Sequence, residues 1–322
     1  MHLMLEEIES EPAIIENYKS KEFEGLDDIL RSLERSTMAY TIGNGTSYHA
    51  ALYSSILLNR KGRNCLPVIS SETENWLNTN KPKSSSIVFS QSGNSVDALN
   101  AAEELKRMGS MIIGVTNNRN SKLGKIANLM LYTDVGSEQS VVATKSHLAQ
   151  LMVALKISIH ENNGEFQKIL EEAKRNAEAI IGRKSAIQEL ADSTTANTVF
   201  LGSGLLYPIA LESSLKLMEA SNSISYAFSV RDFLHGPRQL LDRSWSVFML
   251  STDRKIFQEL DPYAKRVVDL NEFLEEEFGV YSESEVVRSI QLLLFGQLMS
   301  YYTSLSRNLN PDRPSKLTKV VE

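Results

Sequence analysis

Two short polar loops carry residues that are suited to bind an anion. Residues 43–47 (GNGTS) and 90–95 (SQSGNS) each follow an apolar run and precede a segment with helical spacing. The first backbone N–H groups of a helix are unpaired and lie at the positive end of its dipole, which suits a phosphate. The loops add hydroxyl donors and glycines that permit tight turns. These candidates are Gly45, Thr46, Ser47, Ser90, Ser92, Gly93 and Ser95.

Two alternatives compete with a phosphate site at these loops. Serine, threonine and asparagine are also common helix caps and turn formers, so the loops can be purely structural. A nucleotide site is not supported, because Tyr48 stands where a dinucleotide fingerprint needs its third glycine. No Gly-Lys-Ser/Thr P-loop is present either.

A second candidate is the set Glu212, Lys216 and Glu219. Their spacing of four and three residues places them on one face of a helix. Two carboxylates and an amine in line form either a solvated, salt-bridged face or a polar stripe that faces a ligand. The spacing alone leaves both interpretations open.

His235 is the third candidate, in the sequence FLHGP at residues 233–237. A histidine before Gly-Pro cannot lie inside a helix, so we expect it on a turn. Histidine commonly acts as an acid or base near neutral pH, although a structural histidine fits the sequence equally well. No H-E-x-x-H or C-x-x-C spacing occurs and nothing marks Cys65 as reactive. The sequence therefore predicts no metal and no cofactor.

An internal repeat predicts how these residues are positioned. Residues 41–58 (TIGNGTSYHAALYSSILL) align without gaps to residues 200–217 (FLGSGLLYPIALESSLKL), and eight of eighteen positions are identical. Each copy has an apolar strand, a G-x-G turn and an amphipathic helix, which predicts a duplicated α/β domain. Thr46-Ser47 of the first copy becomes Leu205-Leu206 in the second. We therefore expect one phosphate site, in the first half only.

Strands alternate with helices along both halves. The predicted strands after the first repeat segment are 86–90, 111–116, 129–133, 198–201, 246–251 and 266–270, and the predicted helices include 96–108, 121–127 and 285–306. Such alternation indicates parallel strands joined by crossovers, and hence doubly wound sheets that bind ligands at the carboxyl ends of their strands. The predicted division is helices at 1–35, a first domain at 36–170 and a second at 171–310, with a helical connector over 164–196.

Composition excludes several classes of protein. The 322 residues are 42% hydrophobic and 23% charged, with a net charge of −6, which suits a globular chain and disfavours general nucleic-acid binding. About 18 uninterrupted apolar residues are needed to span a membrane, and no such run occurs. One cysteine excludes a disulfide framework, and the start of the chain lacks the pattern of a secretory signal. We expect a cytoplasmic protein that acts on a small molecule.

Seven stretches resemble the sugar-isomerase (SIS) domain superfamily in its tandem form. They are GNGTSYHAA (43–51), SQSGNSVDAL (90–99), GVTN (114–117), GSEQSVVATKSH (136–147), YPIALESSLKLMEAS (207–221), LHGP (234–237) and NPDRPSKLTKVVE (310–322). The chain is similar to the isomerase half of glucosamine-6-phosphate synthase and to the stand-alone deaminases and isomerases related to it. The resemblance implies two flavodoxin-like SIS domains and a tail, 311–322, that completes the active site.

The resemblance also implies a role for individual residues. The sugar-phosphate contacts would be Thr46, Ser47, Ser90, Gln91, Ser92 and Ser95, with backbone contacts to the sugar from Val141 and Thr318. Glu219 would move a proton between C1 and C2, and Lys216 would lie near the reacting carbons. His235 would help to open the sugar ring from the partner subunit of a homodimer with shared sites. Lys319 would engage the open-chain carbonyl.

Two departures from the synthase pattern decide which reaction is expected. Met218 stands where the synthase has a second lysine, directly before the carboxylate. The chain begins Met1-His2, without the cysteine nucleophile of a glutamine-hydrolysing domain, so no ammonia source from glutamine is expected.

The sequence therefore predicts a deaminase/isomerase that converts glucosamine 6-phosphate to fructose 6-phosphate and ammonia. Three alternatives stay open. They are a plain aldose–ketose isomerase of sugar phosphates, a deglycase acting on a fructosamine phosphate, and a non-catalytic sensor that binds sugar phosphates to regulate a partner.

Overall fold

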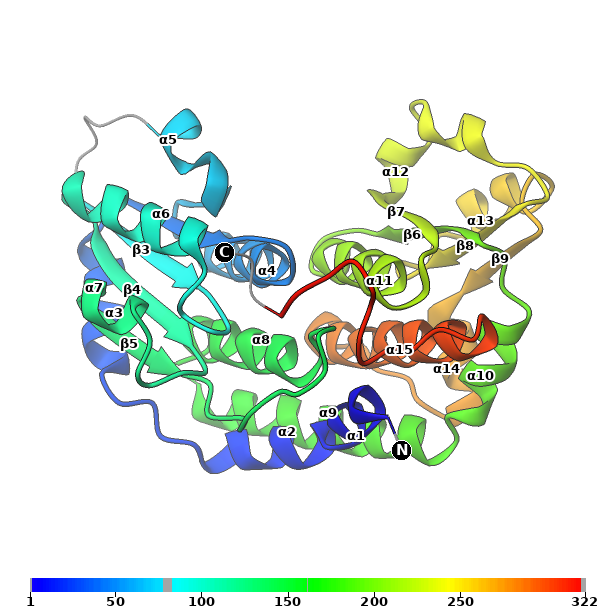
Figure 1. Ribbon diagram of the computed structural model, residues 1–322, viewed down its shortest axis with the longest axis horizontal. Helices are drawn as coiled ribbons and strands as arrows, with labels where there is room; N and C mark the ends of the chain where they lie inside the picture. The colour runs from blue at the N-terminus through cyan, green and yellow to red at the C-terminus, as the bar shows by residue number, and fades with distance from the viewer. Residues whose placement is uncertain (1, 78–82, 161, 320–322) are drawn as a thin grey trace. The chain divides into compact units, whose positions relative to one another are not determined.

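The computed structural model describes residues 2–77, 83–160 and 162–319 (Figure 1). The chain forms two compact units, each built around one parallel sheet. Among the described residues, the five-stranded unit holds 17–138, 145–167 and 318–319, and the four-stranded unit holds 2–16, 139–144 and 168–317. Each unit is thus assembled from separate stretches of chain, whereas the predicted domains are consecutive.

The five-stranded unit has the strand order β2-β1-β3-β4-β5, and all neighbouring pairs are parallel. Its strands are β1 (Met38–Gly43), β2 (Cys65–Ile69), β3 (Ser84–Phe89), β4 (Met111–Thr116) and β5 (Leu129–Tyr132). Its helices are α3 (Leu26–Arg35), α4 (Thr46–Arg60), η1 (Ser70–Glu72), α5 (Thr73–Trp76), α6 (Val96–Arg107), α7 (Leu123–Ile126) and α8 (Lys145–Ser158). Because β2 and β3 lie on opposite sides of β1, the direction of winding reverses between β1 and β3, where ligands bind in open α/β sheets.

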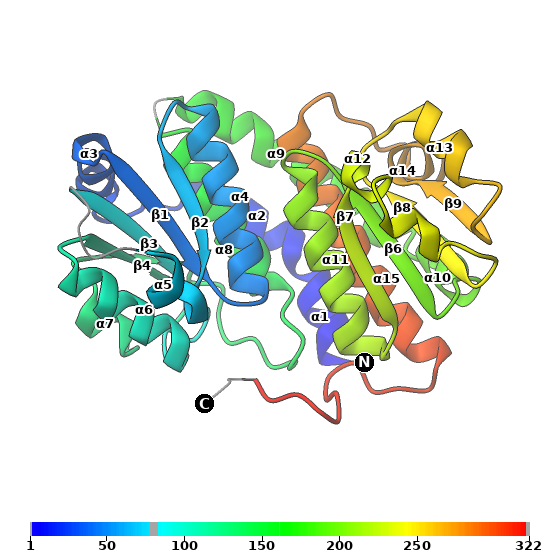
Figure 2. The same cartoon turned by 90° about the horizontal axis from the view of Figure 1, so that it is seen from above.

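Helices cover both faces of this sheet (Figure 2). On one face, α6 and α7 pack on an apolar cluster that includes Ile42, Val88 and Ile112. On the other, α4 contacts β1 and β2 and packs against α8. Strands that are buried on both faces read as continuous apolar runs, which is why β1 and β4 could be predicted.

The four-stranded unit is also parallel, with the order β7-β6-β8-β9. Its strands are β6 (Asn197–Gly202), β7 (Ile224–Ser229), β8 (Trp245–Met249) and β9 (Arg266–Asp269). Its helices are α1 (Leu3–Glu9), α10 (Ser185–Asp192), α11 (Leu206–Ser221), α12 (Val230–Phe233), η2 (Pro237–Leu240), α13 (Arg254–Leu260), α14 (Leu270–Phe278) and α15 (Glu285–Ser306). Two further helices, α2 (Glu11–Ser20) and α9 (Asn163–Gly182), contain residues of both units.

Aromatic packing joins α15 to the sheet of the four-stranded unit. The rings of Phe200 and Phe248 stack with 5.2 Å between centroids, and Phe295 of α15 lies 6.3 Å from Phe248. Gly296 lets α15 approach α11 closely, because a Cβ at this position would overlap the side chain of Ser213. The face of α11 that carries Ser213 therefore lies against α15.

Most predicted elements are confirmed, including helices within residues 2–35 and the helices at 96–108 and 285–306. Strand β7 was missed. It is an edge strand, Ile224 and Tyr226 are exposed, and its polar and apolar residues give no continuous apolar run. Within the part of the chain that the structure describes, no helix is long and apolar enough to cross a membrane.

Candidate functional site

The two polar loops predicted to bind phosphate leave the carboxyl ends of neighbouring strands. Residue 42 of β1 pairs with residue 88 of β3, so the loops that follow these strands both lie at the reversal point of the sheet. Thr46 and Ser47 form the first turn of α4, and Ser95 immediately precedes α6. Two helix N-termini and their hydroxyls therefore converge on one edge of this sheet, which is the arrangement that a phosphate requires.

The hydroxyls of the loops are not ordinary helix caps. Gly45, which precedes α4, has no side chain that could cap the helix. Ser95, which precedes α6, makes no side-chain cap hydrogen bond. Ser90 and Ser92 do stabilise the turn, because their Oγ atoms accept hydrogen bonds from the N–H groups of Gly93 (3.2 Å) and Asn94 (3.1 Å). A hydroxyl that accepts a bond still has its hydrogen to donate. The turn-forming role and a phosphate-binding role are therefore compatible.

The end of β4 and the two residues after it hold the loop at 90–95 in place through hydrogen bonds. The Thr116 hydroxyl donates to the carbonyl of Gln91 at 3.0 Å, and the Asn117 N–H donates to the same carbonyl at 3.0 Å. The Asn118 amide donates to the carbonyl of Ser92 at 3.3 Å. Gln150 of α8 donates to Ser47 Oγ at 3.1 Å and fixes the first loop in a similar way. The loops are therefore preorganised by side chains that local sequence patterns did not identify.

The corresponding loop of the four-stranded unit is occupied by a carboxylate of the chain itself. The Leu205 N–H donates to Glu285 Oε1 at 2.9 Å, and the Ser203 N–H donates to Ser251 Oγ at 2.9 Å. Glu285 is the first residue of α15, so its negative charge lies where an anion would approach α11. This geometry supports the prediction that the second half binds no phosphate at this loop.

A buried ion pair holds the acidic candidate of α11 in place. The ammonium of Lys216 contacts the Glu219 carboxylate and lies 3.5 Å from Glu212 Oε1. The side chains of Glu212 and Lys216 are each 1% exposed, whereas that of Glu219 is 22% exposed. The interpretation as a solvated, salt-bridged face is therefore wrong. Of these three side chains, Glu212 and Lys216 are enclosed and only the Glu219 carboxylate is accessible. An accessible carboxylate held by a buried ammonium is suited to exchange a proton with a ligand.

His235 lies on an exposed turn between α12 and η2, as the Gly-Pro sequence predicts. Its backbone N–H donates to the carbonyl of Asp232 at 3.0 Å. Among the described residues, no hydrogen bond or ion pair joins its side chain to Glu219 or Lys216. Nearby, burial and then the charge of Asp232 raise the pKa of Tyr207, so this phenol is neutral and can donate a hydrogen bond.

The tail carries a contact that the sequence did not predict. Lys319 Nζ lies 3.2 Å from Glu138 Oε2, and the Glu138 side chain is fully buried. Glu138 also accepts hydrogen bonds from the N–H and hydroxyl of Ser146, at 3.2 and 2.6 Å. These three residues are parts of the five-stranded unit, and Thr318 is exposed beside Lys319. The only sequence signal for Glu138 is its place in the motif GSEQSVVATKSH at residues 136–147.

Val141 is engaged by the tail in the four-stranded unit. Its N–H donates to the carbonyl of Asp312 at 3.1 Å, so a contact to a sugar would use the Val141 carbonyl. The Asp312 carboxylate in turn accepts from the N–H groups of Leu3 (2.9 Å) and Met4 (2.8 Å). Glu7 accepts from the backbone of residues 139 and 140. The start of the chain thus binds both residues 139–140, which precede Val141, and Asp312 of the tail.

Cys65 is unsuited to nucleophilic chemistry. Burial raises the pKa of its thiol to about 11, against the smaller opposing effect of hydrogen bonds to Ser55 and Thr41. The reactive thiolate is therefore a minor species at neutral pH. Among the described residues, no group of three or more His, Cys, Asp or Glu side chains is arranged to hold a metal ion.

Comparisons with known proteins find a matching domain family and several similar sequences. Residues 32–159 match the SIS domain. A glutamine–fructose-6-phosphate aminotransferase (isomerizing) of Sulfolobus acidocaldarius is 31% identical over 99% of this chain and 56% of its own length. The Clostridium tetani protein of the same name is 29% identical over 99% of this chain and 59% of its own length. The chain therefore spans a little over half the length of the curated relatives it matches.

Solved structures show the same fold. A glucosamine-6-phosphate deaminase from Thermotoga maritima superposes with a TM-score of 0.81 at 22% identity, over 99% of both chains. The C-terminal domain of glucosamine-fructose-6-phosphate aminotransferase from Francisella tularensis gives 0.85 at 22% identity, over 97% of this chain and 98% of that one. The tagatose-6-phosphate ketose/aldose isomerase of Escherichia coli gives 0.80 at 22% identity, over 98% and 95%.

Proposed function

The chain carries a SIS domain and is homologous to the isomerase domain of glutamine–fructose-6-phosphate aminotransferases, and on this basis we propose that it converts glucosamine 6-phosphate and water to fructose 6-phosphate and ammonia. The observation that carries the proposal is the Lys216–Glu219 pair, in which a buried ammonium orients a partly exposed carboxylate. Isomerisation at C1 and C2 needs one such base. The relatives named for deaminase and ketose/aldose isomerase activities share the fold, and their names are consistent with this chemistry.

The substrate phosphate is assigned to the two loops of the five-stranded unit. Backbone N–H groups at the starts of α4 and α6, with the hydroxyls of Thr46, Ser47, Ser92 and Ser95, supply the donors that a phosphate dianion needs. In the equivalent loop of the four-stranded unit Glu285 accepts the hydrogen bond of the Leu205 N–H, so no substrate phosphate is assigned to that loop.

In the proposed reaction, His235 first moves the proton of the C1 hydroxyl to the ring oxygen, which opens the sugar. Glu219 then removes the C2 hydrogen of the open aldehyde, the electron pair forms the C1–C2 double bond, and the C1 oxygen takes a proton from water, which gives an enolamine. Return of the proton to C1 yields an iminium at C2. Water adds to C2, the C–N bond breaks, and ammonia leaves with fructose 6-phosphate as the other product. Each proton transfer uses a group that can act as both acid and base.

Lys319 has a defined part in this proposal. Its ammonium is held by the buried Glu138 carboxylate, and an ammonium donates hydrogen bonds but is not a nucleophile. We assign it to the carbonyl oxygen of the open chain, where a positive charge stabilises the negative charge that develops during enolisation. Direct attack on the carbonyl would first require transfer of a proton from Lys319.

The proposed reaction is tested by incubating the purified protein with glucosamine 6-phosphate and measuring fructose 6-phosphate and ammonia. Equal amounts of the two products are expected. Isomerisation of sugar phosphates without ammonia release would establish the plain isomerase instead, and release of an amine from a fructosamine phosphate would establish the deglycase. Binding of sugar phosphates without turnover of any of them would establish the sensor.

Replacing Thr46 or Ser92 by alanine is expected to raise the KM for the sugar phosphate by about 10- to 100-fold. Each change removes a charge-assisted hydrogen bond of roughly 1.5–3 kcal/mol, and 1.4 kcal/mol corresponds to a factor of ten. Ser203→Ala, in the loop of the four-stranded unit, is the matched control and leaves KM unchanged. Steady-state kinetics check this, and an unchanged KM in both loop variants would remove the phosphate assignment.

We propose further that the active form is a homodimer in which His235 serves the site of its partner. Mixing inactive Glu219→Gln and His235→Ala variants, under conditions that exchange subunits, is then expected to restore part of the activity. A mixed dimer contains one site with both residues intact, so up to about half of the mixed dimers' sites recover, whereas each variant alone stays inactive. No recovery in demonstrably exchanged dimers, or full activity in a monomer, would contradict sharing.

A further inference from the structure

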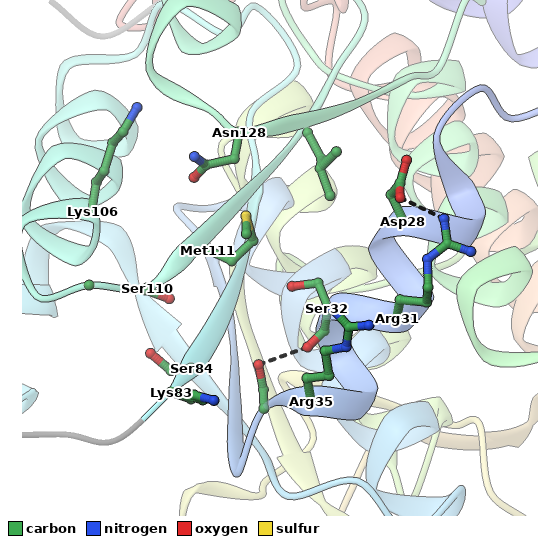
Figure 3. A pocket seen from close by; sticks show the side chains of 13 residues that line it. Asp28, Arg31, Ser32, Arg35, Lys83, Ser84, Lys106, Ser110, Met111 and Asn128 are labelled. Atoms are coloured by element: carbon green, nitrogen blue, oxygen red, sulfur yellow. Dashed lines mark hydrogen bonds and ion pairs between the residues drawn. The ribbon is translucent and has the colours of Figure 1, made fainter.

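A cavity of about 660 Å³ lies at the end of the five-stranded sheet that is opposite to the phosphate loops (Figure 3). It is formed by α3, by the first residues of β3, β4 and β5, and by the end of α6. Strand β3 separates it from the loop at 90–95. A strand of six residues is roughly 20 Å long at about 3.3 Å per residue, so the two places are distinct.

The cavity concentrates positive charge in a chain whose net charge is −6. Four basic residues line it against one carboxylate, that of Asp28, so it has an excess of three positive charges; the four are Arg31, Arg35, Lys83 and Lys106. Asp28 is bound to Arg31 at 2.6 Å, and Lys106 Nζ donates to the carbonyl of Ile126. In the described part of the chain, Arg35 and Lys83 form no ion pair. Two cations are therefore available to a ligand.

Buried hydroxyls hold this arrangement together. Strand β3 begins with three serines, Ser84–Ser86, where a central parallel strand is normally apolar. Ser85 is fully buried, and its Oγ lies 2.6 Å from Ser32 Oγ and 2.8 Å from Ser36 Oγ of the α3 region. These bonds fix the end of α3 that carries Arg35 against the sheet. The serine run has no part in the substrate site, and its effect is to position the basic residues.

From the cavity, its charge and its serine framework we propose a second anion site, specific for a small phosphate-bearing molecule with at least two negative charges. Guanidinium and ammonium groups bind phosphate oxygens through charge-assisted hydrogen bonds, and the hydroxyls of Ser84 and Ser110 add neutral donors at the cavity wall. The site is separate from the substrate loops, so its ligand does not compete with the substrate.

Calorimetric titration with inorganic pyrophosphate tests the proposal without reference to turnover, so its outcome is independent of the proposed reaction. The double variant Arg35→Glu/Lys83→Glu is expected to weaken pyrophosphate binding at one site by at least about tenfold, since two charge-assisted contacts become repulsive. The control Lys255→Glu/Lys265→Glu makes the same change in net charge at exposed lysines of the four-stranded unit and leaves binding unchanged. The double variant Thr46→Ala/Ser92→Ala retains the site.

Three outcomes would overturn the proposal. Equal weakening in the Lys255/Lys265 control would show that only net charge attracts the anion. Loss of all binding in Thr46→Ala/Ser92→Ala, with none lost in Arg35→Glu/Lys83→Glu, would place pyrophosphate at the substrate loops alone. Absence of binding to the wild-type protein at millimolar pyrophosphate would remove the site. Circular dichroism of the Arg35→Glu/Lys83→Glu variant verifies that it is folded.

Discussion

Replacing Glu219 by glutamine is expected to lower turnover of glucosamine 6-phosphate by about 10²- to 10⁴-fold, the range that a positioned general base contributes. Glutamine keeps the shape of the side chain and still accepts a hydrogen bond from Lys216, but it cannot accept the C2 proton. The phosphate loops are untouched, so KM changes little. Steady-state kinetics separate the two effects.

Glu212→Gln is the matched control for this prediction. Glu212 is on the same helix and contacts the same lysine, but its side chain is 1% exposed and cannot reach a ligand. We expect turnover to fall by less than about tenfold in this variant, because it removes a supporting charge and leaves the base in place. Wild-type turnover in Glu219→Gln, or equal losses in the two variants, would contradict the role of Glu219 as the base.

Replacing Lys216 by methionine is expected to destabilise the four-stranded unit by about 3–5 kcal/mol, the usual consequence of removing one partner of a buried ion pair. Methionine fills a similar volume, so the loss comes from the Glu212 carboxylate, which is left buried without its ammonium. Trp245 is buried in the sheet of this unit, whereas Trp76 is exposed in the other unit. Urea unfolding followed by tryptophan fluorescence therefore reports the change.

The double variant Lys216→Met/Glu212→Gln separates electrostatics from packing. It removes both the ammonium and the buried negative charge, so most of the lost stability is expected to return, while the orientation of Glu219 and hence activity are not restored. A Lys216→Met protein as stable as the wild type would show that the pair is not buried as described. A double variant no more stable than Lys216→Met would attribute the loss to packing.

The strand, turn and helix start around residues 43–47 and 90–95 could be predicted from sequence because their signals are local. Each loop joins a continuous apolar run to a helical pattern, so strand end, turn and helix start are read within about fifteen residues. The glycines that end β1 and β6 give the same kind of signal. A Cβ on Gly43 would overlap the carbonyl of Ser47, and a Cβ on Gly202 would overlap that of Leu206. The loops that follow Gly43 and Gly202 therefore share a close approach between the end of the strand and the first turn of the next helix.

The burial of the α11 group could not be predicted in the same way. Spacing places Glu212, Lys216 and Glu219 on one face of a helix, but which face is covered depends on the packing partner. Here α15 lies against α11, and Gly296 sets the approach. Contacts between residues that are distant in sequence could not be predicted either, because they depend on how the elements pack. The pair Glu138 and Lys319, which are 181 positions apart, is an example.

Glucosamine 6-phosphate deuterated at C2 reports whether the Glu219 carboxylate moves the C2 proton of an amino-sugar phosphate. Nuclear magnetic resonance follows the label while the protein turns the substrate over. We expect deuterium to leave C2 and to appear at C1 of fructose 6-phosphate or in solvent, with a primary isotope effect on the rate. We expect the Glu219→Gln variant to lose this transfer together with turnover. A turnover rate that deuterium at C2 does not lower, or transfer that continues unchanged in Glu219→Gln, would contradict this role of Glu219.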